Sequence, residues 1–116
     1  MYARLDLVLM GIGIPSTEHS TVLQTGYVDS AILAGFAAQG AVGDIALRYF
    51  NGQGDPSPFE SFNERVAGIP LDTLKNIPRR VGVVGGRQKT RAVRGAIRGG
   101  FINVLITDID CAQGLL

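Results

Sequence analysis

Two glycines and a lysine stand where an expected strand gives way to an expected helix, in the stretch VGVVGGRQKT at 81–90. Gly85 and Gly86 allow the backbone to turn tightly and to approach a ligand closely. The following helix presents unpaired N–H groups and the positive end of its dipole, and Lys89 adds a cation at its first turn. This combination predicts an anion site, with phosphate as the ligand. A tight strand-to-helix turn without any ligand explains the glycine pair equally well.

Asp44 lies in the segment QGAVGDIA, inside an expected strand made otherwise of small and apolar residues. A carboxylate in such a strand is costly unless it is hydrogen-bonded, paired or facing a wet pocket. Sugar hydroxyls are natural donors to it, and the alternative is a structural carboxylate that accepts backbone N–H groups. Gly40, which ends the helix expected before this strand, is a further candidate ligand contact.

Two other acids are weaker candidates for ligand binding. Glu64 ends a long connection and is able to close over a site, but a local ion pair with Arg65 is the simpler interpretation. Asp108 follows the last expected strand, where it serves either as the N-cap of a helix or as a ligand acceptor. The sequence favours the cap.

A second glycine loop, GIGIPST, follows the first expected strand. Gly11 and Gly13 bring backbone N–H groups toward a ligand, and Ser16 and Thr17 add hydroxyls. His19 is the one histidine of the chain, and no cysteine or carboxylate cluster accompanies it. A surface-loop histidine is therefore a better interpretation than a metal ligand, and no metal or other cofactor is expected.

The helix after the glycine pair is basic and carries Arg91, Arg94 and Arg98 on one face at helical spacing. A nucleic-acid interface is one interpretation of these charges. A solvated face is favoured, because no aromatic interleaving, RNA motif or helix-turn-helix pattern accompanies them.

These candidates depend on alternating strands and helices to position them. Buried strands are expected at 5–11, 41–50, 81–85 and 102–107, and helices at 28–39, 70–78 and 88–100. Continuous apolar runs indicate strands that are buried on both faces. The alternation predicts an α/β protein, a three-layer α/β/α sandwich with a mainly parallel sheet. The long connections at 11–26 and 51–68 leave the carboxyl ends of strands, where such sheets bind ligands.

The composition fits one globular domain. The chain has 116 residues, of which 46% are hydrophobic and 18% charged, with a net charge of +1, so it offers no global attraction for nucleic acid or an anionic membrane. No apolar run is long enough to span a membrane. Cys111, the single cysteine, is expected as a small core residue, which suits a reducing cytoplasm.

Three segments carry a family resemblance: DLVLMGIG, then QGAVGDIALRYFNGQG, then VGVVGGRQKTRAVRGAIRGGFINVLITDIDCAQGLL. In this order they resemble the second half of the sugar-binding effector domain of SorC-type bacterial transcriptional regulators. The resemblance implies part of a fold related to sugar-phosphate isomerases such as glucosamine-phosphate deaminase, used for sensing rather than turnover. It also implies one partial effector domain over 1–116, without the DNA-binding helix-turn-helix and the first half of the effector domain.

Carried onto this chain, the family pattern makes Lys89 and the amides of Gly85 and Gly86 the phosphate contacts. Asp44 becomes the acceptor for sugar hydroxyls, while Gly11 and Gly13 line the floor. The implied partners are a sugar or sugar phosphate, and DNA only through a separate domain. An incomplete sheet edge also predicts a homo-oligomer.

Two alternatives to a sensor remain open from the sequence. One is an isomerase-like enzyme, with Asp44 or Glu64 as the base near the reacting carbons of the sugar. The other is a structural or oligomerising fragment that binds no ligand.

Overall fold

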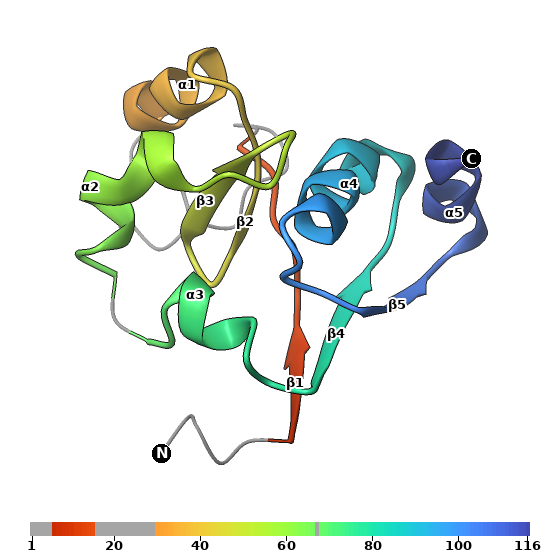
Figure 1. The fold of residues 1–116 in the computed structure, drawn as a ribbon. Coiled ribbons are helices and arrows are strands. Elements are labelled where there is room, and N and C mark those ends of the chain that lie inside the picture. Colours follow the sequence, from red (N-terminus) through yellow and green to blue (C-terminus); the bar gives the residue numbers. More distant parts are fainter. Residues whose placement is uncertain (1–5, 16–29, 67) are drawn as a thin grey trace.

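The computed structural model describes residues 6–15, 30–66 and 68–116 (Figure 1). Its elements follow one another in the order β1 (Leu7–Met10), α1 (Ser30–Ala38), β2 (Ala41–Ile45), β3 (Arg48–Asn51), η3 (Ser57–Phe59), α2 (Glu60–Asn63), α3 (Leu71–Leu74), β4 (Arg79–Val84), η4 (Arg87–Lys89), α4 (Thr90–Arg98), β5 (Val104–Thr107) and α5 (Ile109–Leu115). The η elements are short 3₁₀ helices. Most of the long connection at 11–26, with Ser16, Thr17 and His19, lies outside the described residues.

The strands β1, β4 and β5 form a parallel sheet in the order β1-β4-β5 (Figure 1). Leu9 pairs with Val81, and Val81 pairs in turn with Val104. These strands correspond to three of the four expected ones. The expectation of an α/β fold with a mainly parallel sheet is therefore confirmed.

The prediction of one continuous strand over 41–50 was wrong. It is an antiparallel hairpin of β2 and β3, which forms a separate two-stranded sheet. The chain reverses at Ala46 and Leu47, whose φ angles of 51° and 70° are both positive. The type I′ two-residue hairpin turn requires positive φ at both central residues, which Asn-Gly or Gly-Gly usually provides. Because both arms are buried, the apolar run gave no sign of the reversal.

Helix α4 packs against the hairpin and the parallel sheet through small residues. Ala92, Val93, Gly95 and Ala96 are buried on this face. A Cβ at Gly95 would lie 2.9 Å from the carbonyl oxygen of Asn51, so glycine permits the close approach of helix and hairpin. Helical spacing in the sequence places Ile97 on the same apolar stripe as Ala92, Val93 and Ala96, but Ile97 is 50% exposed.

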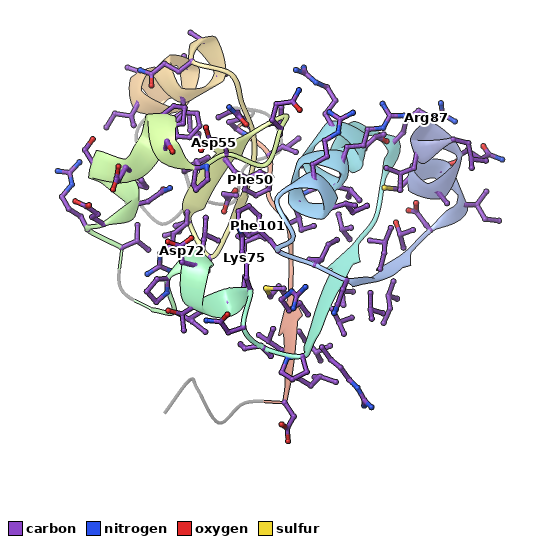
Figure 2. All side chains as sticks on the ribbon, in the orientation of Figure 1. Phe50, Asp55, Asp72, Lys75, Arg87 and Phe101 are labelled. Atoms are coloured by element: carbon purple, nitrogen blue, oxygen red, sulfur yellow. The ribbon has the colours of Figure 1, made fainter. Side chains whose placement is uncertain are left out.

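The main core continues between the hairpin and the end of α4. The rings of Phe50 and Phe101 have centroids 5.3 Å apart. The ammonium of Lys75, in the turn after α3, lies 5.3 Å from the centroid of Phe101, and the three side chains are labelled in Figure 2. Cys111 is fully buried in this core, as expected.

A second, smaller core joins α1 to the other side of the hairpin. Leu33, Ala41, Tyr49 and Phe59 are buried in it, and Phe36 packs on Tyr49 with ring centroids 4.8 Å apart. Helical spacing predicts an apolar stripe of Ile32, Leu33, Phe36 and Ala37 on this helix. Leu33 and Phe36 lie in the core as predicted, whereas Ile32 is 43% exposed and Ala37 is exposed. The aromatic side chains come from α1, β3 and the short helices after β3, so the connection at 51–68 contains the two short helices η3 and α2.

The parallel sheet has one covered and one exposed face among the described residues. Val8, Met10 and Leu105 pack against the main core beneath α4. Alternate residues of the same strands point away from it, and five large apolar side chains there are 44–64% exposed: Leu7, Leu9, Val83, Val104 and Ile106. The helical layer that the sequence predicts over this second face is not formed by the described part of the chain.

Candidate ligand-binding site

Asp44 is held at the end of β2 by the hairpin turn and by the loop after β1. Its backbone pairs with Gly13 through two hydrogen bonds, of 2.9 Å from Gly13 N to Asp44 O and 3.1 Å from Asp44 N to Gly13 O. Its Oδ2 accepts the N–H of Leu47 at 3.1 Å. The side chain is only 6% exposed. The sequence-derived expectation of a buried carboxylate in this strand is confirmed.

Burial raises the pKa of Asp44 above its ordinary value of 3.8. The hydrogen bond from Leu47 and the positive charge of Lys89 act in the opposite direction and are weaker. A carboxylate in such a place gains from additional hydrogen-bond donors, because each donor replaces a part of its lost hydration. Asp44 therefore has the chemistry of an acceptor for ligand hydroxyl groups.

Because Gly13 has no side chain, the Asp44 carboxylate can lie directly against its backbone. A Cβ at position 13 would collide with Asp44 Oδ1. Gly11, in contrast, has nothing within 4 Å of the place of a Cβ, so it lies in open space just after β1. The loop after β1 thus contacts Asp44 through Gly13 and stays open at Gly11.

Lys89 reaches the same loop from η4. Its Nζ donates a hydrogen bond of 2.8 Å to the carbonyl oxygen of Ile12, across 77 residues of sequence. An ammonium group has three N–H donors, and this bond uses one of them. The structure thereby joins Gly13, Asp44 and Lys89 into one group, which we call the Asp44 site.

The glycine pair after β4 forms a second group with Asp108. The N–H of Gly86 donates to Asp108 Oδ2 at 2.9 Å, and the N–H of Cys111 donates to Asp108 Oδ1 at 2.9 Å. Asp108 is therefore the N-cap of α5, the role that the sequence favoured. Gly86 has a φ of 98°, which suits glycine, and its amide already has a partner in the carboxylate. Gly85 lies against the same carboxylate, because a Cβ added at Gly85 would be 3.0 Å from Asp108 Oδ2.

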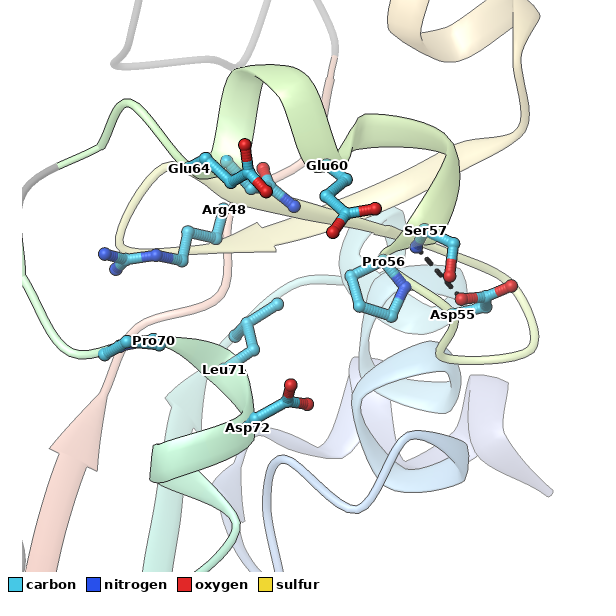
Figure 3. Close-up of a pocket in the computed structure, with 10 residues that line it drawn as sticks. Arg48, Asp55, Pro56, Ser57, Glu60, Glu64, Pro70, Leu71 and Asp72 are labelled. Carbon is cyan, nitrogen blue, oxygen red and sulfur yellow. Dashed lines mark hydrogen bonds between the residues drawn. The ribbon is translucent and has the colours of Figure 1, made fainter.

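Gly40 and Glu64 lie in other parts of the molecule. Gly40 turns the chain from α1 into β2 with a φ of 94°, and a Cβ there would lie 4.0 Å from Asn51 Cβ. Glu64 lines a pocket of about 500 Å³ between α2 and α3 (Figure 3). The residues that line this pocket include none of the Asp44 site.

This pocket contains a charged residue that the sequence analysis missed. Arg48, 5% exposed, donates through Nη2 to the carbonyl oxygens of Val66 and Gly68 at 2.8 and 3.0 Å. It therefore anchors the segment between α2 and α3. The signal that singled out Asp44, a charge within an apolar strand, was equally present at Arg48.

Tyr49 was also missed, although it faces Asp44 directly across the hairpin. It is fully buried, and its hydroxyl has no hydrogen-bond partner among the described residues. Burial, together with the negative charge of Asp44, raises the pKa of Tyr49 above its ordinary value of 10.0. The hydroxyl therefore stays protonated and neutral beside the Asp44 carboxylate.

The basic face of α4 has structural partners. Arg94 donates to the carbonyl oxygen of Gly114 at 2.8 Å, and Arg98 donates to that of Gly52 at 3.0 Å. These two arginines tie α4 to α5 and to the turn after β3. In the described part of the chain, no group of three or more His, Cys, Asp or Glu residues is placed to hold a metal ion, and no helix is long and apolar enough to cross a membrane.

Comparisons with known proteins identify the family of the chain. The family model described as "Putative sugar-binding domain" matches residues 1–116. The transcriptional regulator LsrR of Klebsiella pneumoniae is 35% identical over 112 residues, which cover 96% of this chain and 35% of that protein. The chain belongs to this sugar-binding domain family. The sugar-binding description and the name of this regulator agree with the non-catalytic sensing that the family resemblance implied.

Solved structures support the same family. One of them is a domain from Arthrobacter aurescens, described as that of "a possible sugar-binding transcriptional regulator", which is 30% identical to this chain with a TM-score of 0.84. The match covers 98% of this chain and 43% of the Arthrobacter aurescens chain. The full-length sorbitol operon regulator SorC of Klebsiella pneumoniae shares the fold, with 24% identity, a TM-score of 0.81 and coverage of 98% of this chain and 36% of that one. The sugar-binding domain described here thus spans well under half the length of these relatives.

Proposed function

We propose that this domain senses a sugar or sugar phosphate at the Asp44 site. The observation that carries the proposal is the convergence of opposite charges on one loop. The buried Asp44 carboxylate lies against Gly13, and the Lys89 ammonium binds the neighbouring carbonyl of Ile12. A carboxylate that accepts hydroxyls and an ammonium that binds phosphate are the two groups that a phosphorylated sugar requires.

Within this proposal each candidate residue has a distinct role. Lys89 contacts the phosphate with its remaining donors, and Asp44 accepts sugar hydroxyls. Gly11 provides the open side of the loop. The amides of Gly85 and Gly86 are the further phosphate contacts, and the Gly86 amide is free for this only if Asp108 gives up its bond on ligand binding. Ligand binding at the glycine pair would then change the cap of α5.

The rest of the regulator is also part of the proposal. In the longer chain we expect a separate domain to bind DNA in the cytoplasm, with the sugar-binding domain forming a homo-oligomer whose assembly responds to ligand. The names of the relatives support the regulatory role. The identity of the sugar depends on loop geometry around the Asp44 site.

Isothermal titration with a panel of sugars, the matching sugar phosphates and inorganic phosphate tests the proposal. Lys89→Ala should weaken binding of a phosphosugar by about 1.5–3 kcal/mol, or roughly 10- to 150-fold, and leave the unphosphorylated sugar nearly unaffected. Arg91→Ala, which removes an exposed cation at the start of α4, is the matched control and should leave both affinities unchanged. An equal loss for both ligands in Lys89→Ala would contradict the phosphate assignment.

A further inference from the structure

Asp44 and Tyr49 face each other across the hairpin of β2 and β3. The N–H and C=O of Asp44 both bond to Gly13. The N–H of Tyr49 donates to Asn63 Oδ1 at 2.9 Å, and Asn63 Nδ2 donates to the carbonyl oxygen of Tyr49 at 3.0 Å. Asp44 and Tyr49 therefore form a non-hydrogen-bonded pair, the kind of antiparallel pair in which the two side chains lie closest together.

The ring of Tyr49 packs on aromatic side chains from three helices. Its centroid lies 4.8 Å from that of Phe36 in α1, 6.5 Å from that of Phe59 in η3 and 5.9 Å from that of Phe62 in α2. All three neighbours are phenylalanines, so packing within this cluster requires no hydroxyl at position 49. The polar atom of Tyr49 needs a different explanation.

The Tyr49 hydroxyl is a buried donor that the described residues leave unbonded. The residue is 0% exposed, and its hydroxyl oxygen has no hydrogen-bond partner among them. An unbonded buried hydroxyl is costly, and phenylalanine would fill the same space without that cost. Burial and, to a lesser extent, the negative charge of Asp44 raise the pKa of Tyr49, so the hydroxyl keeps its proton.

A donor beside an acceptor is complementary to a hydroxyl group. The ionised Asp44 carboxylate only accepts hydrogen bonds, and the protonated Tyr49 hydroxyl has one to donate. A sugar hydroxyl can donate to the first and accept from the second at the same time. A carbonyl oxygen has no proton for Asp44, an ammonium group has no lone pair for Tyr49, and a deoxy carbon has neither.

We propose that Tyr49 determines the ligand specificity of the Asp44 site by donating to the same sugar hydroxyl that donates to Asp44. This step rests on the proposed function. It narrows the ligand to a sugar or sugar phosphate with a hydroxyl, rather than a keto, amino or deoxy group, at the recognised carbon. Because Tyr49 is more deeply buried than Asp44, at 0% against 6% exposure, this hydroxyl belongs to the innermost end of the ligand.

Isothermal titration with glucose 6-phosphate, fructose 6-phosphate and ribose 5-phosphate, and then with the monodeoxy analogues of whichever binds, tests the proposal. Tyr49→Phe should weaken binding of the parent compound by roughly 3- to 10-fold, as expected for one neutral hydrogen bond. It should not affect the one analogue that lacks the recognised hydroxyl, because that analogue cannot form the bond in either protein. The other analogues should lose affinity as the parent does.

Phe59→Leu is the matched control, because it disturbs the same aromatic cluster and retains the Tyr49 hydroxyl. It should lower the Tm of the ligand-free protein and leave the ratio of affinities between the parent compound and its analogues unchanged. The Tm of ligand-free Tyr49→Phe should equal or exceed that of the wild type, because the substitution removes only an unbonded hydroxyl.

Three results would overturn the proposal while the proposed function stands. Tyr49→Phe has no effect on binding, it weakens the parent and all analogues equally, or it lowers the Tm without ligand by about five degrees or more. The last result would assign the hydroxyl to a structural partner such as a buried water molecule. If the wild type binds none of the probes, the proposed function itself fails and this inference fails with it.

Discussion

Asp108 accepts the backbone N–H of Gly86 at 2.9 Å, which ties the glycine turn after β4 to the first turn of α5. The other oxygen of the same carboxylate accepts the N–H of Cys111. One side chain therefore caps a helix and fixes the turn that the sequence suggested as a phosphate loop. At the Gly86 amide, the carboxylate accepts the hydrogen bond that the sequence analysis expected a phosphate oxygen to accept.

Loss of this carboxylate should be costly to the fold. Asp108→Ala removes the α5 cap and leaves the Gly86 amide without its acceptor, so we expect a loss of about 1–2 kcal/mol in the free energy of unfolding in urea. Asp110→Ala, which removes another acid from the first turn of α5, is the control and should cost no more than about 0.3–1 kcal/mol. Equal losses in the two variants would show that Asp108 stabilises the fold through its negative charge at the helix N-terminus and not through its hydrogen bonds to Gly86 and Cys111.

The two glycines of the loop after β1 should differ sharply in their tolerance of a side chain. Gly13→Ala forces a Cβ onto the Asp44 carboxylate and should cost about 1–3 kcal/mol of stability, because the backbone pairing of the two residues prevents relaxation. Gly11→Ala meets nothing within 4 Å and should stay within about 0.5 kcal/mol of the wild type. Chemical denaturation of both variants measures the difference. A neutral Gly13→Ala would mean that Asp44 moves freely.

The sequence predicted the fold class, and it singled out three residues that the structure brings together around one loop, for local physical reasons. A charge within an apolar strand and a glycine where the backbone must come close are both visible without a structure, and they identified Asp44, Gly13 and Lys89. The direction of the Lys89 side chain was not predictable. Its contact with Ile12 spans 77 residues and depends on how η4 lies beside the end of β1.

The errors also have physical causes. The hairpin turn was missed because Ala46 and Leu47 are residues that rarely adopt positive φ, so no turn signal marked the reversal within the apolar run. Ile97 was assigned to the buried face by its spacing, whereas the close approach of the hairpin requires the small side chains of Ala92, Gly95 and Ala96 there. Periodicity locates an apolar stripe, but the shape of the partner decides which of its residues are covered.

The turn itself provides a test of backbone strain. Ala46 has a φ of 51° and is exposed, so Ala46→Gly should relieve the left-handed conformation at no cost in packing. The gain is partly offset by the greater freedom of glycine in the unfolded chain, and we expect a net stabilisation of about 0.5–1 kcal/mol. Ala34→Gly, at an exposed position inside α1, is the control and should destabilise by about 1 kcal/mol. Thermal unfolding should therefore shift in opposite directions for the two variants.

Asp44 should lower the free energy of unfolding as pH rises, whereas most acidic residues of folded proteins raise it. Its pKa is raised in the folded state, so between the ordinary value of 3.8 and the raised value the folded chain binds more protons than the unfolded chain. The free energy of unfolding must then decrease as pH rises through this window, and the contribution of Asp44 is fully present only below it. Asp44→Asn retains an acceptor for the Leu47 amide and cannot ionise.

Urea unfolding of wild type and Asp44→Asn from pH 3.5 upward to neutrality measures this effect. The variant should gain stability relative to wild type as pH rises, and it should be at least as stable at pH 7 while binding the sugar more weakly. Asp72→Asn, an exposed acid on α3, should show no such pH-dependent gain. If Asp44→Asn instead loses stability at pH 7, the ionised carboxylate is a structural group of the hairpin, and ligand hydroxyls are not needed to explain its burial.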